Sequence, residues 1–258
     1  MVENLKALYR YRALISALVV RHLSSRYRGS ILGFLWSILN PLFLMLVYTL
    51  VFRYYMRFDQ PNYAIFLFVG LLPWLWFASA LQEATSSIAG SGHLITKSMF
   101  PAHVLPLVSI LVNFVNFLLS LPLLFIFMLF SGLTFHWTLL LLPLVLFLQL
   151  IFLYGASLAL SSLNVYFRDV QHLLGNILTF VFFLCPIIYP PEAVPAKLKF
   201  TLVLNPLAAM TTFYHDLILE GKLPPLNTVV YVCAWIGMLL IIGHLIYERY
   251  KESFAEAL

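Results

Sequence analysis

The chain has 258 residues, of which 62% are hydrophobic and only 10% are charged. Soluble domains carry about 25% charged residues, so this composition excludes a soluble globular protein and indicates a chain whose solvent is lipid. The formal net charge is +5, but the cations lie mostly at the ends of apolar segments, which favours topology signals over nucleic-acid binding.

The first 30 residues form a basic arm that precedes the first apolar segment. At about 100° per residue, four cations fall on one stripe of a helix: Lys6, Arg10, Arg21 and Arg28. The opposite face is apolar and contains Leu5, Leu8, Tyr11, Ile15, Leu18 and Val19. This segregation predicts an amphipathic interface helix within residues 1–30, lying in the headgroup plane, with Arg12 and Arg26 snorkelling from its apolar side. The alternative is a basic tail that serves only as a topology signal.

Six apolar segments follow, each near the length of about 20 residues that a membrane-crossing helix needs. They cover residues 31–52, 62–82, 104–130, 138–161, 172–190 and 226–247. An even number of crossings places both termini on one side. That side carries ten Lys or Arg residues and the other side five, so the excess predicts cytoplasmic termini. The sequence therefore predicts an all-α integral membrane protein with one six-span domain over residues 31–258.

The loop between the second and third segments, residues 84–103, contains the sequence GSGHLITKSMFP. It is similar to a phosphate-binding loop, but that motif needs glycine directly before the lysine, and here Thr96 precedes Lys97. We therefore expect no nucleotide site on this chain. The loop also carries residues that would expose apolar surface: Leu94, Ile95, Met99 and Phe100. They favour docking into the groove of a partner, with a membrane-surface turn as the alternative.

Two further loops flank the fifth apolar segment. Arg168 and Asp169 precede it. The functional interpretation is that this pair fixes the start of the fifth segment or contacts a neighbouring subunit. The alternative is a solvated charge pair that contributes little. Residues 191–225 follow it on the outer side and are apolar in pieces too short to cross a membrane. Asn205 and Pro206 interrupt this stretch, which predicts re-entrant or interfacial helices that border a pore.

An intramembrane hydrolase is a function of another class that the sequence leaves open. Ser157 on the fourth segment and His244 on the sixth are similar in placement to the serine and histidine of rhomboid proteases. The residue after the serine is Leu158 where those enzymes carry glycine, so a small packing residue is the favoured interpretation. Cys185 and Cys233 offer no metal-ligand spacing, and we expect neither a metal nor a cofactor on this chain.

Five motifs in chain order carry a resemblance to a known family: SRYRGSILGFLWSILNP, FPAHVLP, NVYFRDVQHLL, CPIIYPPEAVP and NPL. Together they resemble the ABC-2 transport permeases, and within them the branch that exports O-antigen, capsule or teichoic acid. The resemblance runs over nearly the whole chain. An ABC-2 exporter of a drug or a lipid is the alternative within the same family.

The resemblance implies a homodimeric permease of the bacterial inner membrane that carries no catalytic site. A pair of ABC ATPase subunits would bind ATP and Mg²⁺, and the cargo would be a polysaccharide on an undecaprenyl diphosphate anchor. The ATPase would contact a coupling helix near residues 92–100, with the candidate residues His93, Leu94, Ile95, Lys97 and Phe100. Residues 191–225 would form the outer gate, in which His215 replaces an arginine of the family pattern.

Three groups of candidate site residues follow. Arg21, Arg26 and Arg28 would form a basic entrance for the diphosphate headgroup, unless they bind anionic membrane lipid instead. Aromatic residues on the first and fifth segments would stack on sugars along the channel, with lipid-facing packing as the alternative: Trp36, Phe43, Tyr48, Phe52, Phe180, Phe183 and Tyr189. The expected structural or gating residues are Gly29, Gly33, Pro41, Arg168, Asp169, Asn205 and Pro206.

Overall fold

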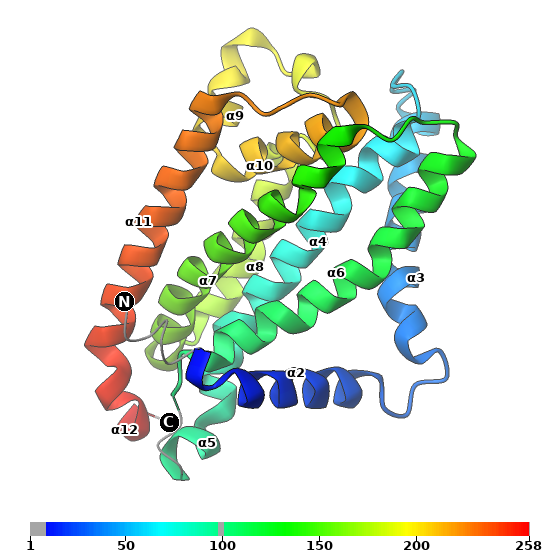
Figure 1. Cartoon of the computed structure of the whole chain (residues 1–258). Helices are drawn as coiled ribbons and strands as arrows, with labels where there is room; N and C mark the ends of the chain where they lie inside the picture. Colours follow the sequence, from blue (N-terminus) through cyan, green and yellow to red (C-terminus); the bar gives the residue numbers. More distant parts are fainter. Residues whose placement is uncertain (1–8, 98–100, 258) are drawn as a thin grey trace.

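The computed structural model describes residues 9–97 and 101–257, and within them every regular element is helical. Five helical segments are long and apolar enough to cross a membrane: Gly33–Tyr55, Tyr63–Ser87, Val104–Phe130, Trp137–Tyr166 and Leu226–Ser253. Their main helices are α3 (Trp36–Thr49), α4 (Tyr63–Ser87), α6 (Val104–Phe130), α7 (Leu142–Tyr166) and α11 (Leu226–Tyr250), which form an upright bundle (Figure 1). The prediction of an all-α integral membrane protein is confirmed.

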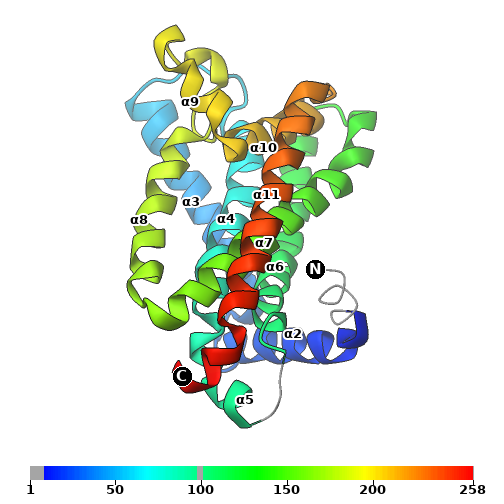
Figure 2. The same ribbon diagram turned by 90° about the vertical axis from the view of Figure 1, so that its left-hand side faces the viewer.

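The fifth predicted segment, residues 172–190, is shorter in the structure than the sequence suggested. Its helix, α8 (Asp169–Leu184), has 16 residues and a length of about 24 Å, less than the roughly 30 Å of a hydrocarbon core. The helix ends early because Pro186 forces Cys185 into an extended conformation, with φ −96° and ψ 145°. Figure 2 shows α8 upright at one side of the bundle. The count of six crossings stays a prediction.

The centre of the bundle is α4, which lies between α6 and α7 in Figure 1. Of its most apolar window, 78% is buried inside the protein, a larger share than in the other four long helices. A helix that is hydrophobic all round is typical of a buried core position or of a membrane span. Five helices contact α4: α3, α6, α7, α8 and α10 (Pro206–His215). The position of these helices relative to one another therefore depends on α4.

The basic arm forms α2 (Arg12–Tyr27), which lies across one end of the bundle (Figure 1). Ile15 and Leu23 are buried in a cluster with three valines of α6: Val104, Val108 and Val112. The apolar face of the predicted interface helix therefore packs against α6 in the described part, and its place in the headgroup plane stays a prediction. Residues 1–8, including Leu5, Lys6 and Leu8, lie outside the described residues.

The opposite end of the bundle carries α9 (Lys199–Leu204) and α10 (Figure 1). The predicted break at Asn205 and Pro206 is confirmed, since one helix ends before these residues and the next begins at Pro206. The Asn205 side chain accepts a hydrogen bond of 3.0 Å from the Leu207 amide, and Pro206 occupies the first turn. Both features are typical of a helix N-terminus. A gating role for these helices stays a prediction.

The helices α7 and α11 cross at two glycines. A Cβ atom at Gly155 would lie 2.9 Å from the backbone of Leu239, and one at Gly243 would collide with the Gly155 carbonyl oxygen. Backbone atoms cannot rotate away from such a contact, so the two helices approach this closely only because neither residue has a side chain.

We expect Gly243→Ala to lower the free energy of unfolding by about 1–3 kcal/mol, because the added methyl group forces the helices apart. Thermal unfolding in detergent micelles measures this loss. Gly237→Ala is the matched control on the same helix, since its Cβ would meet nothing within 4 Å. Equal losses for the two variants would contradict a role for the close approach.

Candidate functional site

The linker between α2 and α3 turns the chain from a direction across the bundle to one along it. Gly29 has a φ of 80° and Gly33 a φ of 48°, both in the left-handed region that glycine adopts without strain. These values give a physical reason for the two glycines that the sequence singled out. Pro41 lies inside α3 and is buried.

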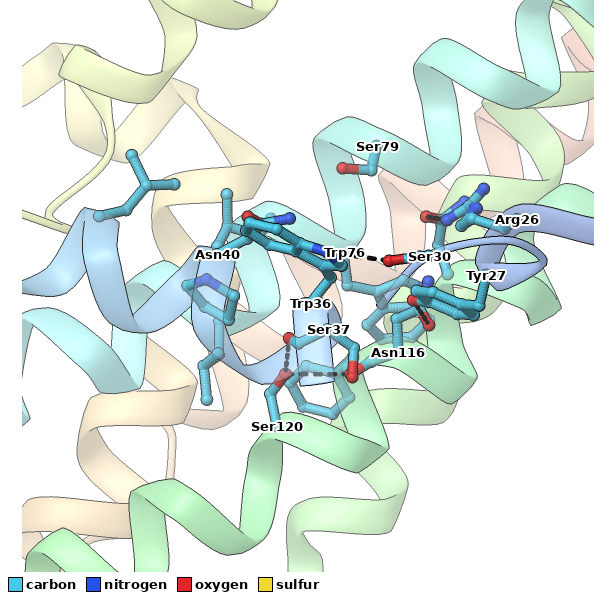
Figure 3. Close-up of a pocket in the computed structure, with 16 residues that line it drawn as sticks. Arg26, Tyr27, Ser30, Trp36, Ser37, Asn40, Trp76, Ser79, Asn116 and Ser120 are labelled. Carbon is cyan, nitrogen blue, oxygen red and sulfur yellow. Dashed lines mark hydrogen bonds between the residues drawn. The ribbon is translucent and has the colours of Figure 1, made fainter. Parts of the chain in front are cut away.

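A polar cavity of about 470 Å³ lies beside this linker, and we call it the membrane cavity (Figure 3). It is lined by Arg26, Tyr27, Ser30, Trp36, Ser37, Asn40, Pro41, Leu44, Leu72, Leu75, Trp76, Ser79, Asn113, Asn116, Phe117 and Ser120. Hydroxyl, amide and indole groups from α3, α4 and α6 thus meet among apolar helices. The helix α6 supplies two asparagines and a serine of this wall.

Hydrogen bonds fix several polar groups of the membrane cavity (Figure 3). The Trp36 indole donates to Ser30 Oγ at 3.2 Å, which ties the start of α3 to the linker. The Tyr27 hydroxyl donates to Asn116 Oδ1 at 2.7 Å, and this bond joins the end of α2 to α6. Trp36 is the one predicted channel aromatic that lines this cavity.

A second cavity of about 480 Å³ lies at the end of the bundle that carries α2, and we call it the basal cavity. It is lined by Leu18, Arg21, His22, Ser25, Arg26, Glu83, Ser86, Ser87, Gly90, Ser91, His93, Leu105, Val108 and Ser109. Cations and hydroxyl groups outnumber its single carboxylate. Arg26 is the residue that both cavities share.

Arg26 lies in a network of charges and amides between the two cavities. Its Nη2 atom is 2.5 and 2.6 Å from the two carboxylate oxygens of Glu83, and Nη1 donates to Asn113 Oδ1 at 3.2 Å. Asn113 Nδ2 in turn donates to Glu83 at 2.8 Å. The predicted snorkelling of Arg26 is wrong, because the apolar side of α2 faces α6 and the arginine meets the Glu83 carboxylate of α4. Sequence reasoning missed Glu83, although an acid beside an apolar segment was the available signal.

The other two arginines of the predicted entrance lie apart from this network. Arg21 is exposed and lines the basal cavity, whereas Arg28 is exposed in the linker and lines neither cavity. The structure therefore brings Arg21 and Arg26 together at one cavity and leaves Arg28 outside it.

The predicted coupling segment forms a short helix, α5 (Gly92–Lys97), at the same end of the bundle (Figure 1). His93 is exposed and lines the basal cavity. Ile95 packs against a buried cluster of the same chain, so the expectation that it is fully exposed is wrong. Phe100 lies outside the described residues, as do the side chains of Leu94 and Lys97.

Comparisons with known proteins address the class to which this bundle belongs. The family model of the ABC-2 type transporter matches residues 13–218, which is most of the chain. The O-antigen export system permease protein RfbA of Myxococcus xanthus is 40% identical over 260 residues, which cover 100% of both chains. The chain belongs to the ABC-2 type transporter family.

Further relatives extend this similarity. An RfbA O-antigen export permease of Klebsiella pneumoniae is 34% identical, with 99% of this chain and 100% of the relative covered. The polysialic acid transport protein KpsM of Escherichia coli is 24% identical over 93% of this chain and 94% of the relative. This ABC-2 chain is therefore similar over almost its full length to permeases named for polysaccharide export or transport.

The remaining predicted channel aromatics of this ABC-2 chain are divided between positions packed on the core and exposed positions. Tyr48 and Phe52 pack against the core, where the Tyr48 ring stacks on Phe182 at 5.6 Å. Three others are exposed along the outside of α3 and α8: Phe43, Phe180 and Phe183. The Tyr189 hydroxyl donates to the Phe183 carbonyl at 2.8 Å and ties the extended segment after α8 to that helix.

Arg168 and Asp169 are both exposed at the start of α8. Asp169 occupies the first helical turn, where the helix dipole stabilises a negative charge. This placement is consistent with the predicted role of the pair at the start of the fifth segment.

A third cavity, of about 820 Å³, lies at the end of the bundle that carries α10, and His215 and Asp216 line it. His215 stacks on Phe66 with ring centroids 4.3 Å apart, and its Nε2 atom is 3.0 Å from the Phe66 carbonyl oxygen. Burial lowers the pKa of His215 to about 4, so this residue is neutral at pH 7. Burial raises the pKa of Asp216 to about 6.

The hydrolase alternative needs a hydrogen bond between Ser157 and His244. Ser157 is fully buried, and its Oγ atom has no hydrogen-bond partner among the described residues. The serine is therefore not activated by a base, and its burial fits the role of a small packing residue.

Proposed function

We propose that this chain is the channel-forming permease subunit of an ATP-driven exporter of lipid-linked polysaccharide in the bacterial inner membrane. The observation that carries this proposal is the full-length 40% identity to an O-antigen export permease. Two copies of the chain would form the channel, and two ABC ATPase subunits would bind ATP and Mg²⁺. The end of the bundle with α2 and α5 would face the cytoplasm, and so would both termini, as the distribution of cations favours.

The two cavities that share Arg26 support a path for the cargo. Arg21, His22 and His93 give the basal cavity the charge and hydrogen-bond donors that suit a diphosphate. Amides, hydroxyls and two tryptophans give the membrane cavity groups that suit sugars, which combine hydroxyls with apolar ring faces. The headgroup would therefore enter at the basal cavity and reach Arg26 at its inner wall.

The Arg21→Ala variant tests this path against the alternative that the arm only binds anionic lipid. In a strain that lacks the native gene, we expect this variant to export about tenfold less polysaccharide, as lost charge-assisted hydrogen bonds are worth roughly 1.5–3 kcal/mol. Quantification of polysaccharide on the cell surface measures this effect, with permease abundance in the membrane as the normalising value.

Arg10→Ala is the matched control, because Arg10 is an exposed cation on the same polar stripe but lines neither cavity. Anionic-lipid binding would make the two variants equal, which would contradict the headgroup path. Unchanged surface polysaccharide after deletion of the gene itself would overturn the proposed cargo and favour a drug or lipid exporter.

A further inference from the structure

The helix α5 cannot hold its position by its own stability. It has six residues, whereas isolated helices shorter than about 12–15 residues are marginal in water. Its pose must therefore come from the surface on which it packs. That surface includes the last residues of the chain, since α12 (Phe254–Ala257) contacts α5 directly and lies beside it in Figures 1 and 2.

Phe254 is the centre of this contact. Its side chain is 0% exposed, in a cluster of residues from four parts of the chain: Ile88, Ala102, Leu105, Leu158, Val165, Tyr247 and Phe254. The Phe254 ring lies 6.0 Å from the ring of Tyr247 and 6.4 Å from that of Tyr166. Ile95 of α5 packs against the same cluster, so Phe254 forms part of the surface on which the coupling helix packs.

Polar contacts fasten the C-terminal segment at the same place. The hydroxyls of Tyr166 and Ser253 lie 2.5 Å apart, and the Tyr166 hydroxyl also donates to the Tyr250 carbonyl at 3.4 Å. Lys251 forms an ion pair of 2.6 Å with Glu248 one turn earlier. The segment is therefore attached to the ends of α7 and α11 on one side and to α5 on the other.

We propose that the C-terminal segment Lys251–Ala257 positions α5 for the ABC ATPase, with Phe254 as the positioning residue. This inference rests on the proposed function, which makes α5 the contact for the ATPase. Because Phe254 is fully buried, it acts through α5 and not by touching the partner. The same contacts join α5 to the ends of α7 and α11, so a displacement of the coupling helix reaches two long helices of the bundle.

The test compares Phe254→Ala, Phe254→Leu and Glu256→Ala in the purified full-length chain. We expect Phe254→Ala to increase amide hydrogen exchange over residues 92–97 about tenfold. The same variant should weaken binding of the purified cognate ABC ATPase by a similar factor. The reason is that a binding-competent position of α5 that is populated one-tenth of the time lowers the apparent affinity about tenfold. Phe254→Leu keeps apolar contact and should recover most of both values. Glu256→Ala, an exposed position on the same helix, should match the unmodified chain.

Amide exchange in α4 shows whether a variant has retained its fold. If Phe254→Ala has not, the smaller loss that remains in Phe254→Leu must appear both in exchange over residues 92–97 and in ATPase binding, and its absence from the exchange would overturn the inference. Unchanged exchange over residues 92–97 in Phe254→Ala would overturn the inference. His93→Glu, on the exposed side of α5, separates this inference from the proposed function. If His93→Glu weakens ATPase binding and Phe254→Ala does not, the positioning role alone fails. If neither variant weakens ATPase binding, both the positioning role of Phe254 and the coupling role of α5 fail.

Discussion

Replacing Glu83 with alanine is expected to lower the free energy of unfolding by about 2–3 kcal/mol and to reduce export more than tenfold. The change leaves the Arg26 guanidinium without the carboxylate that fixes its position, so the cation is no longer held between the two cavities, where the proposed path needs it. Side chains of this pair are 26% and 36% exposed, so the cost lies between the roughly 1 kcal/mol of a surface pair and the 3–5 kcal/mol of a fully buried one. Unfolding in detergent micelles and surface polysaccharide in cells measure the two effects.

The double variant Arg26→Met with Glu83→Met separates the structural role of the pair from its role toward cargo. Removal of both charges leaves no unpaired ion, so we expect stability to return to within about 1 kcal/mol of the unmodified protein. Export should stay low, because the residue shared by both cavities has lost its cation. A double variant that exports normally would show that Arg26 does not contact the cargo.

Gln149→Leu is expected to cost about 2–4 kcal/mol of stability, because it leaves the buried Tyr214 hydroxyl without its acceptor and removes the hydrogen bond to the Pro73 carbonyl. Gln149 is 3% exposed on α7 and bridges two other helices. Its Nε2 atom donates to the Pro73 carbonyl of α4 at 2.9 Å, and the Tyr214 hydroxyl of α10 donates to its Oε1 atom at 2.7 Å. Thermal unfolding measures the loss, and exchange of the α10 amides shows whether that helix loosens first.

The pair Gln149→Leu with Tyr214→Phe provides the internal control for this prediction. It removes the stranded hydroxyl as well as its acceptor, so most of the lost stability should return, since replacing both partners by apolar groups of similar shape is nearly neutral. A double variant as unstable as Gln149→Leu alone would mean that packing, and not the unsatisfied hydroxyl, dominates.

Apolar length and helix breakers predicted the elements that depend on local chemistry. Residues 104–130 match α6 in both bounds, because a long apolar run there begins and ends at polar or turn residues. The break at Asn205 and Pro206 follows from capping chemistry that acts within a few residues. Pro186 indicated that α8 ends early. The predicted span nevertheless continued to residue 190, because the residues after the helix are apolar although they are not helical.

The candidate site was harder to predict because it depends on which surfaces meet. A helical wheel separates the faces of α2, but it does not distinguish lipid from the valines of α6 as the environment of the apolar face. The predicted second span stopped at residue 82, and Glu83 was therefore placed at the end of a span, whereas α4 continues to Ser87. Ile95 likewise lies 159 positions before Phe254, its neighbour in the same cluster, and no local pattern connects them.

The two glycines in the linker between α2 and α3 have a consequence for how the protein could open. Nothing lies within 4 Å of a Cβ atom built on Gly29 or Gly33, so these positions are constrained by backbone torsion and not by space. One side of the linker, α2, is anchored on α6, and the other leads into the segment with the smallest buried share of the five long ones, at 11%. The backbone torsion angles at Gly29 and Gly33 therefore set the angle between α2 and α3. The width of the membrane cavity depends on this angle, because α3 forms part of the cavity wall.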